Sequence, residues 1–191
     1  MSRIILCTGG VRSGKSRFAA TVMQDAKDVV YIATMEALDD EMIERIAQHK
    51  RARPSHWVTK EQPLCPFNAV ENAVASEKHY ILDCVTMLTS NIMLKALDSG
   101  EIVTKEIVIS SQMQKDIISK VLFELETLIN MINSLDGTLV MVTNETGYSV
   151  VPDNHFARVF RDILGTVNRE IAFLCDEVYL SVCGLQIKIK G

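Results

Sequence analysis

Short apolar runs alternate with longer amphipathic stretches along most of the chain. The runs are rich in β-branched residues and are bounded by polar residues, which is typical of buried strands. The predicted strands cover residues 3–8, 29–33, 80–84 and 138–143, with a closing pair at 177–182 and 186–190. Residues 52–66 carry three prolines, and this predicts a loop that could contain one short strand.

Apolar residues at helical spacing predict helices between these strands. In the second helix Met42, Ile43 and Ile46 form an apolar stripe, and Asp39 is a good N-cap. The predicted helices cover residues 16–25, 39–51, 67–76, 86–98, 106–135 and 152–174. This alternation predicts one α/β domain over residues 1–191, with a mostly parallel sheet, helices on both faces and a short antiparallel strand pair at the C-terminus.

The first predicted strand leads into a stretch that fits the phosphate-binding pattern G-x-x-x-x-G-K-[ST], namely Gly9, Gly10, Val11, Arg12, Ser13, Gly14, Lys15 and Ser16. Glycines let successive backbone N–H groups point at phosphate oxygens, and the helix N-terminus adds partial positive charge. In this pattern Lys15 reaches the β- and γ-phosphates, and the Ser16 hydroxyl ligates Mg²⁺. The chain is therefore predicted to bind a nucleoside triphosphate.

Composition narrows the function classes further. The 191 residues are 48% hydrophobic and 23% charged, which is typical of one globular domain. A net charge of −4 and only 6% aromatic residues count against a nucleic-acid-binding module, which needs a basic face and stacking side chains. No apolar run approaches the roughly twenty residues of a membrane span. Five scattered cysteines with no C-x-x-C pair favour a reduced, cytoplasmic protein.

Polar residues follow three of the predicted strands, at the edge of the sheet where ligands bind: Thr34 and Glu36, Asp83, and Asn144 and Glu145. Asp83 has the arrangement of an acidic residue that holds Mg²⁺ directly or through water. Its alternative role is to cap the following helix. Glu145 could orient the acceptor or a water, or it could be a loop carboxylate without a role in the chemistry.

His49 shares the helix face of Ile46 and is followed by three cations, Lys50, Arg51 and Arg53. A neutral imidazole backed by these cations could attack an α-phosphorus and form a phosphoramidate while pyrophosphate leaves. Alternatively, the imidazole complements the dipole at the helix C-terminus and the basic run is simply solvated. The residues alone favour the second interpretation. They also admit a monofunctional small-molecule kinase or a RecA-like ATPase.

These motifs resemble those of the bifunctional adenosylcobinamide kinase/adenosylcobinamide-phosphate guanylyltransferase family of cobalamin synthesis. The likeness runs nearly end to end, and its most specific parts are H-K-x-x-R-P-x-H-W at 49–57 and V-T-N-E-x-G at 142–147. Further matching stretches are T-G-G-V-R-S-G-K-S-R at 8–17, Y-I-A-T at 31–34 and R-x-F-R-D-I-x-G-x-V-N at 158–168. Family members often carry two adjacent histidines where this chain has Gln48 and His49, so one imidazole is available here.

The resemblance implies a RecA-like fold, a propeller-like homotrimer and two reactions. The terminal phosphate of ATP or GTP passes to the aminopropanol hydroxyl of adenosylcobinamide. GTP then guanylylates a histidine, and the GMP moves to adenosylcobinamide phosphate to give adenosylcobinamide-GDP. The guanylylated histidine falls on His49. The family's nucleotide contacts fall on residues 9–16 and on Thr34, Met35, Glu36, Lys50, Arg51, Ala52, Arg53, Glu61 and Asp83.

Overall fold

A central sheet of seven strands organises the part of the chain that the computed structural model describes. That part comprises residues 2–36, 40–51, 53–71, 78–98 and 108–191, with the backbone alone for residues 41, 42, 45, 49 and 98. The strands are β1 (Arg3–Gly9), β2 (Val29–Ala33), β3 (Val58–Glu61), β4 (His79–Asp83), β5 (Thr138–Val142), β6 (Glu177–Val182) and β7 (Leu185–Lys190). The helices within it are α1 (Lys15–Val22), α2 (Asp40–Arg51), α3 (Asn68–Glu71), α4 (Val85–Asp98), α5 (Ser111–Ser134) and α6 (His155–Leu174).

The strands lie in the order β3-β2-β4-β5-β1-β6-β7. All neighbouring pairs are parallel except β6 and β7, which form an antiparallel hairpin at one edge. This confirms the predicted α/β class and the closing antiparallel pair. Because β1 to β6 run in the same direction, their carboxyl ends meet along one edge of the sheet, where ligands of such folds bind.

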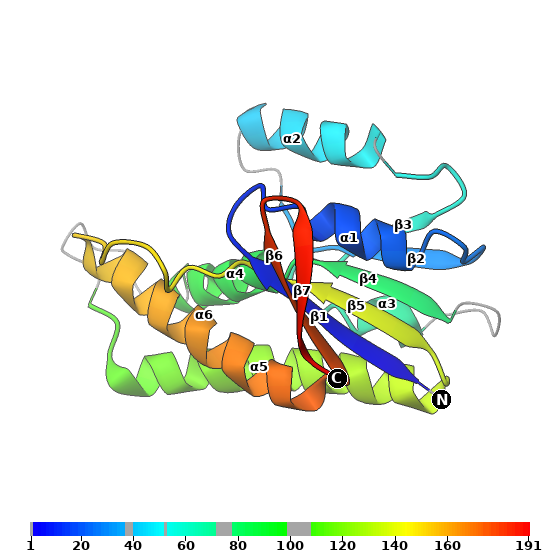
Figure 1. Ribbon diagram of the computed structural model, residues 1–191. Helices are drawn as coiled ribbons and strands as arrows, with labels where there is room; N and C mark the ends of the chain where they lie inside the picture. The colour runs from blue at the N-terminus through cyan, green and yellow to red at the C-terminus, as the bar shows by residue number, and fades with distance from the viewer. Residues whose placement is uncertain (1, 37–39, 52, 72–77, 99–107) are drawn as a thin grey trace.

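Helices cover both faces of the sheet (Figure 1). Ile4 and Leu6 of β1 pack with α4, α5 and α6, whereas Ile5 packs with α1 on the opposite face. This alternation is the two-residue period of a strand, and it leaves β1 buried on both sides, as is usual for parallel strands. α2 stands apart, above α1 and away from the sheet, in Figure 1.

Two helices begin later than the sequence predicted. α5 begins at Ser111, residues 108–110 before it are not helical, and the predicted start at 106 lies outside the described residues. The Ser110 hydroxyl accepts a hydrogen bond of 3.2 Å from the N–H three residues later. α6 begins at His155 rather than at 152, where the Asn154 side chain accepts one of 2.6 Å in the same way. Both predictions were wrong about the start because these caps supply a partner for a free N–H of the first turn, which sets the helix boundary.

The other predicted bounds differ less. α1 ends at Val22 rather than at 25, and α3 spans Asn68–Glu71, whereas its predicted continuation over 72–76 lies outside the described residues. The remaining strands and α4 agree with the prediction to within one or two residues. In the described part of the chain, no helix combines the length and the apolar character needed to cross a bilayer.

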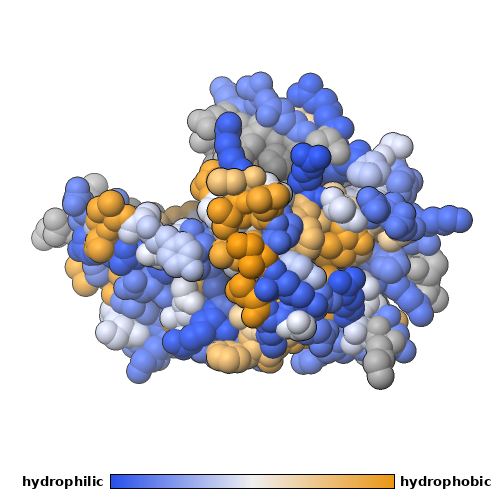
Figure 2. Space-filling model, in the orientation of Figure 1, coloured by the Kyte–Doolittle hydropathy of each residue, from blue (hydrophilic) through white to orange (hydrophobic). Residues whose placement is uncertain are grey.

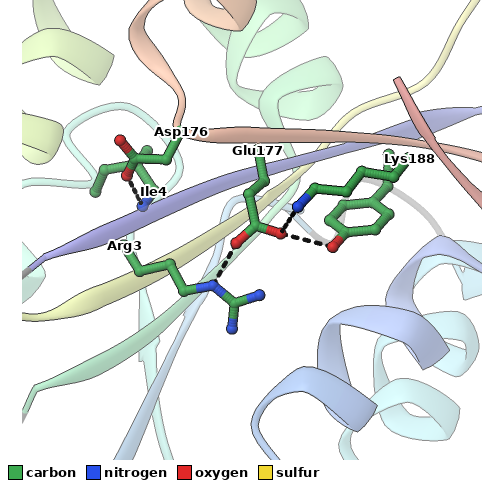
Figure 3. Close-up of polar contacts among 6 residues, drawn as sticks. Arg3, Ile4, Asp176, Glu177 and Lys188 are labelled. Carbon is green, nitrogen blue, oxygen red and sulfur yellow. Dashed lines mark hydrogen bonds and ion pairs between the residues drawn. The ribbon is translucent and has the colours of Figure 1, made fainter. Parts of the chain in front are cut away.

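A cluster of polar contacts ties the hairpin to the start of β1 (Figure 3). The Glu177 carboxylate accepts hydrogen bonds from Arg3 Nε (2.5 Å) and the Tyr179 hydroxyl (2.6 Å), and it pairs with Lys188 Nζ at 3.1 Å. The hydrogen bond from Arg3 lowers the pKa of the Glu177 carboxyl to about 2, so this group stays ionised at neutral pH. The cluster lies at the opposite end of β1 from the phosphate loop and is structural.

Candidate nucleotide site

The phosphate loop joins β1 to α1 and depends on glycine at two positions. Gly9 and Gly14 adopt φ of +145° and +101°, conformations that side chains rarely allow. A Cβ at Gly9 would also lie 2.4 Å from the carbonyl oxygen of Ser181 on β6. The loop is therefore shaped both by its own backbone and by the strand beside it.

Lys15 is buried and points back over this loop. Its Nζ donates hydrogen bonds to the carbonyl oxygens of Gly9 (2.9 Å) and Gly10 (2.6 Å). Burial lowers the pKa of the Lys15 ammonium, and nearby thiols and Asp83 oppose that shift. The ammonium is thus held where the loop opens, and a phosphate oxygen could replace the two carbonyl oxygens as the acceptor of its hydrogen bonds.

The β6–β7 hairpin supports the loop from behind. The Gly184 N–H at its tip donates to the carbonyl oxygen of Ser13 at 2.9 Å. A Cβ at Gly14 would lie 3.1 Å from the Gly184 Cα, so the two glycines pack closely against each other. The phosphate loop and the last strands of the chain therefore form one structural unit. The sequence patterns did not predict this contact between the hairpin and the loop.

A cavity of about 480 Å³ opens at this edge of the sheet. The predicted site residues that line it are Val11, Arg12, Ser13, Gly14, Lys15, Ser16, Met35, Lys50, Arg53, Glu61 and Asp83. It is also lined by Asn144, which was expected at this edge of the sheet, and by residues that were not predicted as site residues, namely Arg17, Tyr31, Ala33, Ile46, Cys84, Met87 and Val142. Its cationic groups outnumber its carboxylates, which suits an anionic triphosphate.

Other predicted residues lie near the cavity without lining it. Among the described residues these are Gly9, Gly10, Thr34, Glu36 and Arg51. Ala52 lies outside the described residues, as does the side chain of His49, whose backbone belongs to α2.

Thr34 joins the ends of β2 and β4 beneath the cavity. Its buried hydroxyl donates to the carbonyl oxygen of Cys84 and accepts from the Cys84 N–H, both at 2.8 Å. The Asn91 side chain donates to the Thr34 carbonyl at 2.8 Å. Thr34 therefore fixes the backbone beside Asp83. Its position directly after a predicted strand was equally consistent with direct contact to the nucleotide.

Asp83 is held by a stack of side chains from β2 and the segment after α2. The Tyr31 hydroxyl donates a hydrogen bond to Asp83 Oδ2. The Arg53 guanidinium lies 3.5 Å from the centre of the Tyr31 ring, and Trp57 stacks with that ring at 6.4 Å. Burial, together with the Asp83 charge, raises the pKa of the Tyr31 hydroxyl, so it stays a neutral donor. The sequence predicted Tyr31 as part of a buried strand and of the Y-I-A-T stretch, and not as a partner of Asp83.

Hydrogen bonds also fix the end of β5. The Asn144 N–H donates to the Thr86 hydroxyl (2.7 Å), and the Asn168 amide donates to the Asn144 carbonyl (3.0 Å). The next N–H, that of Glu145, donates to the Gly9 carbonyl at 3.0 Å. The Glu145 carboxylate accepts from the Gly147 N–H at 2.6 Å, which favours a role within its own loop.

α2 reaches the cavity through Ile46 and Lys50, which lie one helical turn apart. Lys50 Nζ forms an ion pair with Glu61 Oε1 of β3 at 2.6 Å, so the end of α2 is tied to the edge of the sheet. His49 lies on the same turn of backbone, between these two positions. The helix that carries the predicted nucleophile therefore borders the nucleotide cavity.

Comparison with known proteins covers nearly the whole chain. Residues 5–189 match the family described as cobinamide kinase / cobinamide phosphate guanyltransferase. The chain is 38% identical to the bifunctional adenosylcobalamin biosynthesis protein CobU of Salmonella typhimurium, over 98% of this chain and 99% of that protein. It is 36% identical to the Escherichia coli protein of the same name, with the same coverage. It is also 33% identical to the Pseudomonas aeruginosa protein CobP, over 97% of this chain and 96% of that one.

Among solved structures, an ATPase from the type III secretion system of pathogenic bacteria is similar with a TM-score of 0.56 at 13% identity. The alignment covers 97% of this chain but 56% of the ATPase, so the chain spans a little over half of that protein's length. At this identity the likeness concerns the fold alone. It agrees with the predicted RecA-like arrangement.

Proposed function

This chain belongs to the cobinamide kinase / cobinamide phosphate guanyltransferase family, and from this premise we propose that one cavity serves both reactions, with His49 as the guanylyl carrier. As a member, the chain is an enzyme of adenosylcobalamin biosynthesis with kinase and guanylyltransferase activities. One observation carries the proposal. A single cavity is lined by the phosphate loop, by Asp83 and by α2, the helix that contains His49.

In the kinase reaction the phosphate loop holds ATP or GTP. The acceptor hydroxyl of adenosylcobinamide forms a bond to the γ-phosphorus while the bond to the β-phosphate oxygen breaks, and the hydroxyl proton is released. ADP or GDP leaves. Lys15 stabilises the charge on the transferred phosphoryl group and on the leaving oxygen, because its ammonium is held at the mouth of the loop.

In the guanylyl reaction a ring nitrogen of neutral His49 attacks the α-phosphorus of GTP. The P–N bond forms as the bond to the bridging oxygen breaks, pyrophosphate leaves and the imidazole loses its proton. A phosphate oxygen of adenosylcobinamide phosphate then bonds to the same phosphorus as the P–N bond breaks, and the released imidazole takes up a proton. Lys50 of α2 and Arg53, which follows that helix, both line the cavity and would neutralise the departing pyrophosphate.

We also propose that Mg²⁺ enters with the nucleotide and is held by Ser16 and Asp83. Both residues line the cavity and offer the oxygen ligands that Mg²⁺ prefers, and phosphate oxygens and water would complete its shell. Within the described residues, no cluster of three or more His, Cys, Asp or Glu side chains could hold an ion. When bound, Mg²⁺ would neutralise phosphate charge; the chain's contribution is to fix the Asp83 carboxylate through Tyr31.

Tyr31→Phe should lower kcat/KM of the kinase reaction about 10- to 100-fold at limiting Mg²⁺, because a hydrogen bond to a charged acceptor contributes about 1.5–3 kcal/mol. Excess Mg²⁺ should restore part of the loss, since the variant removes the group that orients Asp83 and leaves the carboxylate in place. The measurement is kinase rate against Mg²⁺ concentration. Tyr179→Phe is the matched control, because it removes a hydroxyl that donates to another carboxylate, that of Glu177, outside the cavity. An unaltered Mg²⁺ dependence in Tyr31→Phe would contradict this role.

The proposed function is tested with GTP labelled at the α-phosphate. Incubation without acceptor should leave label on the protein that survives base and is lost in acid, as a phosphoramidate does. Addition of adenosylcobinamide phosphate should then move the label to adenosylcobinamide-GDP. Absence of protein-bound label under conditions in which the product forms would contradict a covalent intermediate.

We further propose a homotrimer and a cytoplasmic location. Support for assembly comes from β7, an edge strand whose Leu185, Ile187 and Ile189 are exposed on one face; Figure 2 shows hydrophobic atoms along this strand. Sedimentation at the 21.3 kDa of a single chain would contradict the trimer.

Support for the cytoplasmic location comes from five cysteines that are all free thiols. Recovery of the protein from an extracytoplasmic fraction would contradict it.

A further inference from the structure

The loop between β5 and α6 leaves three apolar side chains in solvent within four residues. Tyr148, Val150 and Val151 are 85%, 91% and 58% exposed. Isolated exposed apolar residues are ordinary, but a contiguous group marks a surface that binds something. Hydrophobic atoms are visible in Figure 2 at the left end of the molecule, where Figure 1 places this loop. We name these three side chains the apolar shelf.

The backbone around the apolar shelf is well anchored. The Gly147 N–H donates to Glu145 Oε1 at 2.6 Å, and the Ser149 hydroxyl donates to the Thr146 carbonyl at 3.0 Å. Arg158 of α6 donates to the carbonyl oxygen of Pro152 at 2.9 Å. A surface already held in place loses little conformational freedom on binding, which favours affinity.

The loop that carries the apolar shelf begins at the edge of the nucleotide cavity. Asn144 lines that cavity, and the Glu145 N–H binds the carbonyl of Gly9, the same oxygen that receives a hydrogen bond from Lys15 Nζ. Val150 follows Glu145 by five residues, so at most about 18 Å of extended chain separates them. Because Lys15 contacts the β- and γ-phosphates in such loops, the shelf begins on the side from which an acceptor approaches the terminal phosphate.

We propose that the apolar shelf binds the corrin ring of the acceptor, an inference that rests on the proposed function. The cavity of about 480 Å³ is of a size for one nucleotide, so the macrocycle must lie outside it with only its aminopropanol arm entering. A corrin ring carries methyl groups on its faces and amide arms at its edge. The shelf offers apolar contacts for the methyl groups of the ring. The Asn144 side chain, which lines the cavity, could form hydrogen bonds with the aminopropanol arm.

Two other apolar surfaces fit this acceptor less well. A second cavity of about 690 Å³ lies between α4 and α5 and shares no lining residue with the first. The exposed face of β7 is a strand surface at the edge of the sheet, which suits another protein chain better. The shelf lies on the loop whose Glu145 N–H is hydrogen-bonded to the Gly9 carbonyl of the phosphate loop, whereas the second cavity is lined by no residue of the phosphate loop.

The test uses the full-length Tyr148→Ser and Val150→Ser variants, whose exposed positions should leave folding intact. The KM for adenosylcobinamide should rise about tenfold or more, and the double variant should show a larger rise. The KM for GTP and the labelling of the protein by GTP alone should stay at their wild-type values. Phe173→Ser is the control, because it removes an exposed ring (73%) at the other end of α6.

An unchanged KM for adenosylcobinamide in the double variant would overturn the proposal. A fall in sedimentation coefficient together with weaker binding of both substrates would also overturn it, because the shelf would then be a subunit contact. A wild-type enzyme that is never labelled by GTP would instead contradict the His49 intermediate, and the kinase KM would still decide the role of the shelf.

Discussion

Replacing His49 with alanine should abolish the labelling of the protein by α-labelled GTP and lower guanylyl transfer by at least about a thousandfold. The reason is that a covalent intermediate cannot form without its nucleophile. The kinase rate should remain within about tenfold of wild type, since direct transfer of a γ-phosphoryl group needs no enzyme nucleophile. Both reactions are measured separately, by protein-bound label and by the formation of adenosylcobinamide phosphate.

Gln48→Ala is the matched control for this variant. Gln48 is the exposed neighbour of His49 on α2, and its side chain contacts only Glu44 of the same helix in the described contacts, at 3.4 Å. This control should keep wild-type labelling. Undiminished labelling in His49→Ala would refute the assignment of the nucleophile, because no adjacent second histidine could substitute for it.

Lys15→Ala should reduce kcat/KM of both reactions by about a hundred- to a thousandfold, the loss typical of removing one preorganised donor from a developing charge. It would also remove the hydrogen bonds from Lys15 Nζ to the Gly9 and Gly10 carbonyls. The two rates are measured on the same preparation, together with a thermal melt that establishes folding. Lys27→Ala, at an exposed position on the segment after α1, is the control and should leave both rates unchanged.

Loss of kinase activity with full retention of GMP labelling in Lys15→Ala would contradict the single cavity. Such a result would require a second phosphate site for the guanylyl reaction. Equal loss of both activities, with an unchanged melting temperature, would support the use of one phosphate loop for both nucleotides.

Local patterns along the chain were sufficient for the fold class and for the phosphate loop. The phosphate loop requires a strand that ends at Gly9, glycines at positions with positive φ and a helix that begins at Lys15. Because these requirements concern neighbouring residues, a short stretch of sequence shows them. The same is true of strand periodicity in β1, whose alternate residues face two different cores. The motif that contains His49 also lies within nine residues.

Contacts between distant segments were decided by packing. Tyr31 and Asp83 are 52 residues apart, and they meet because β2 and β4 pair in a register that aligns Ala33 with Asp83. The bond from Gly184 to Ser13 likewise requires that β6 lie beside β1. Register and strand order follow from how all the apolar faces are buried together, so no single stretch of residues encodes them.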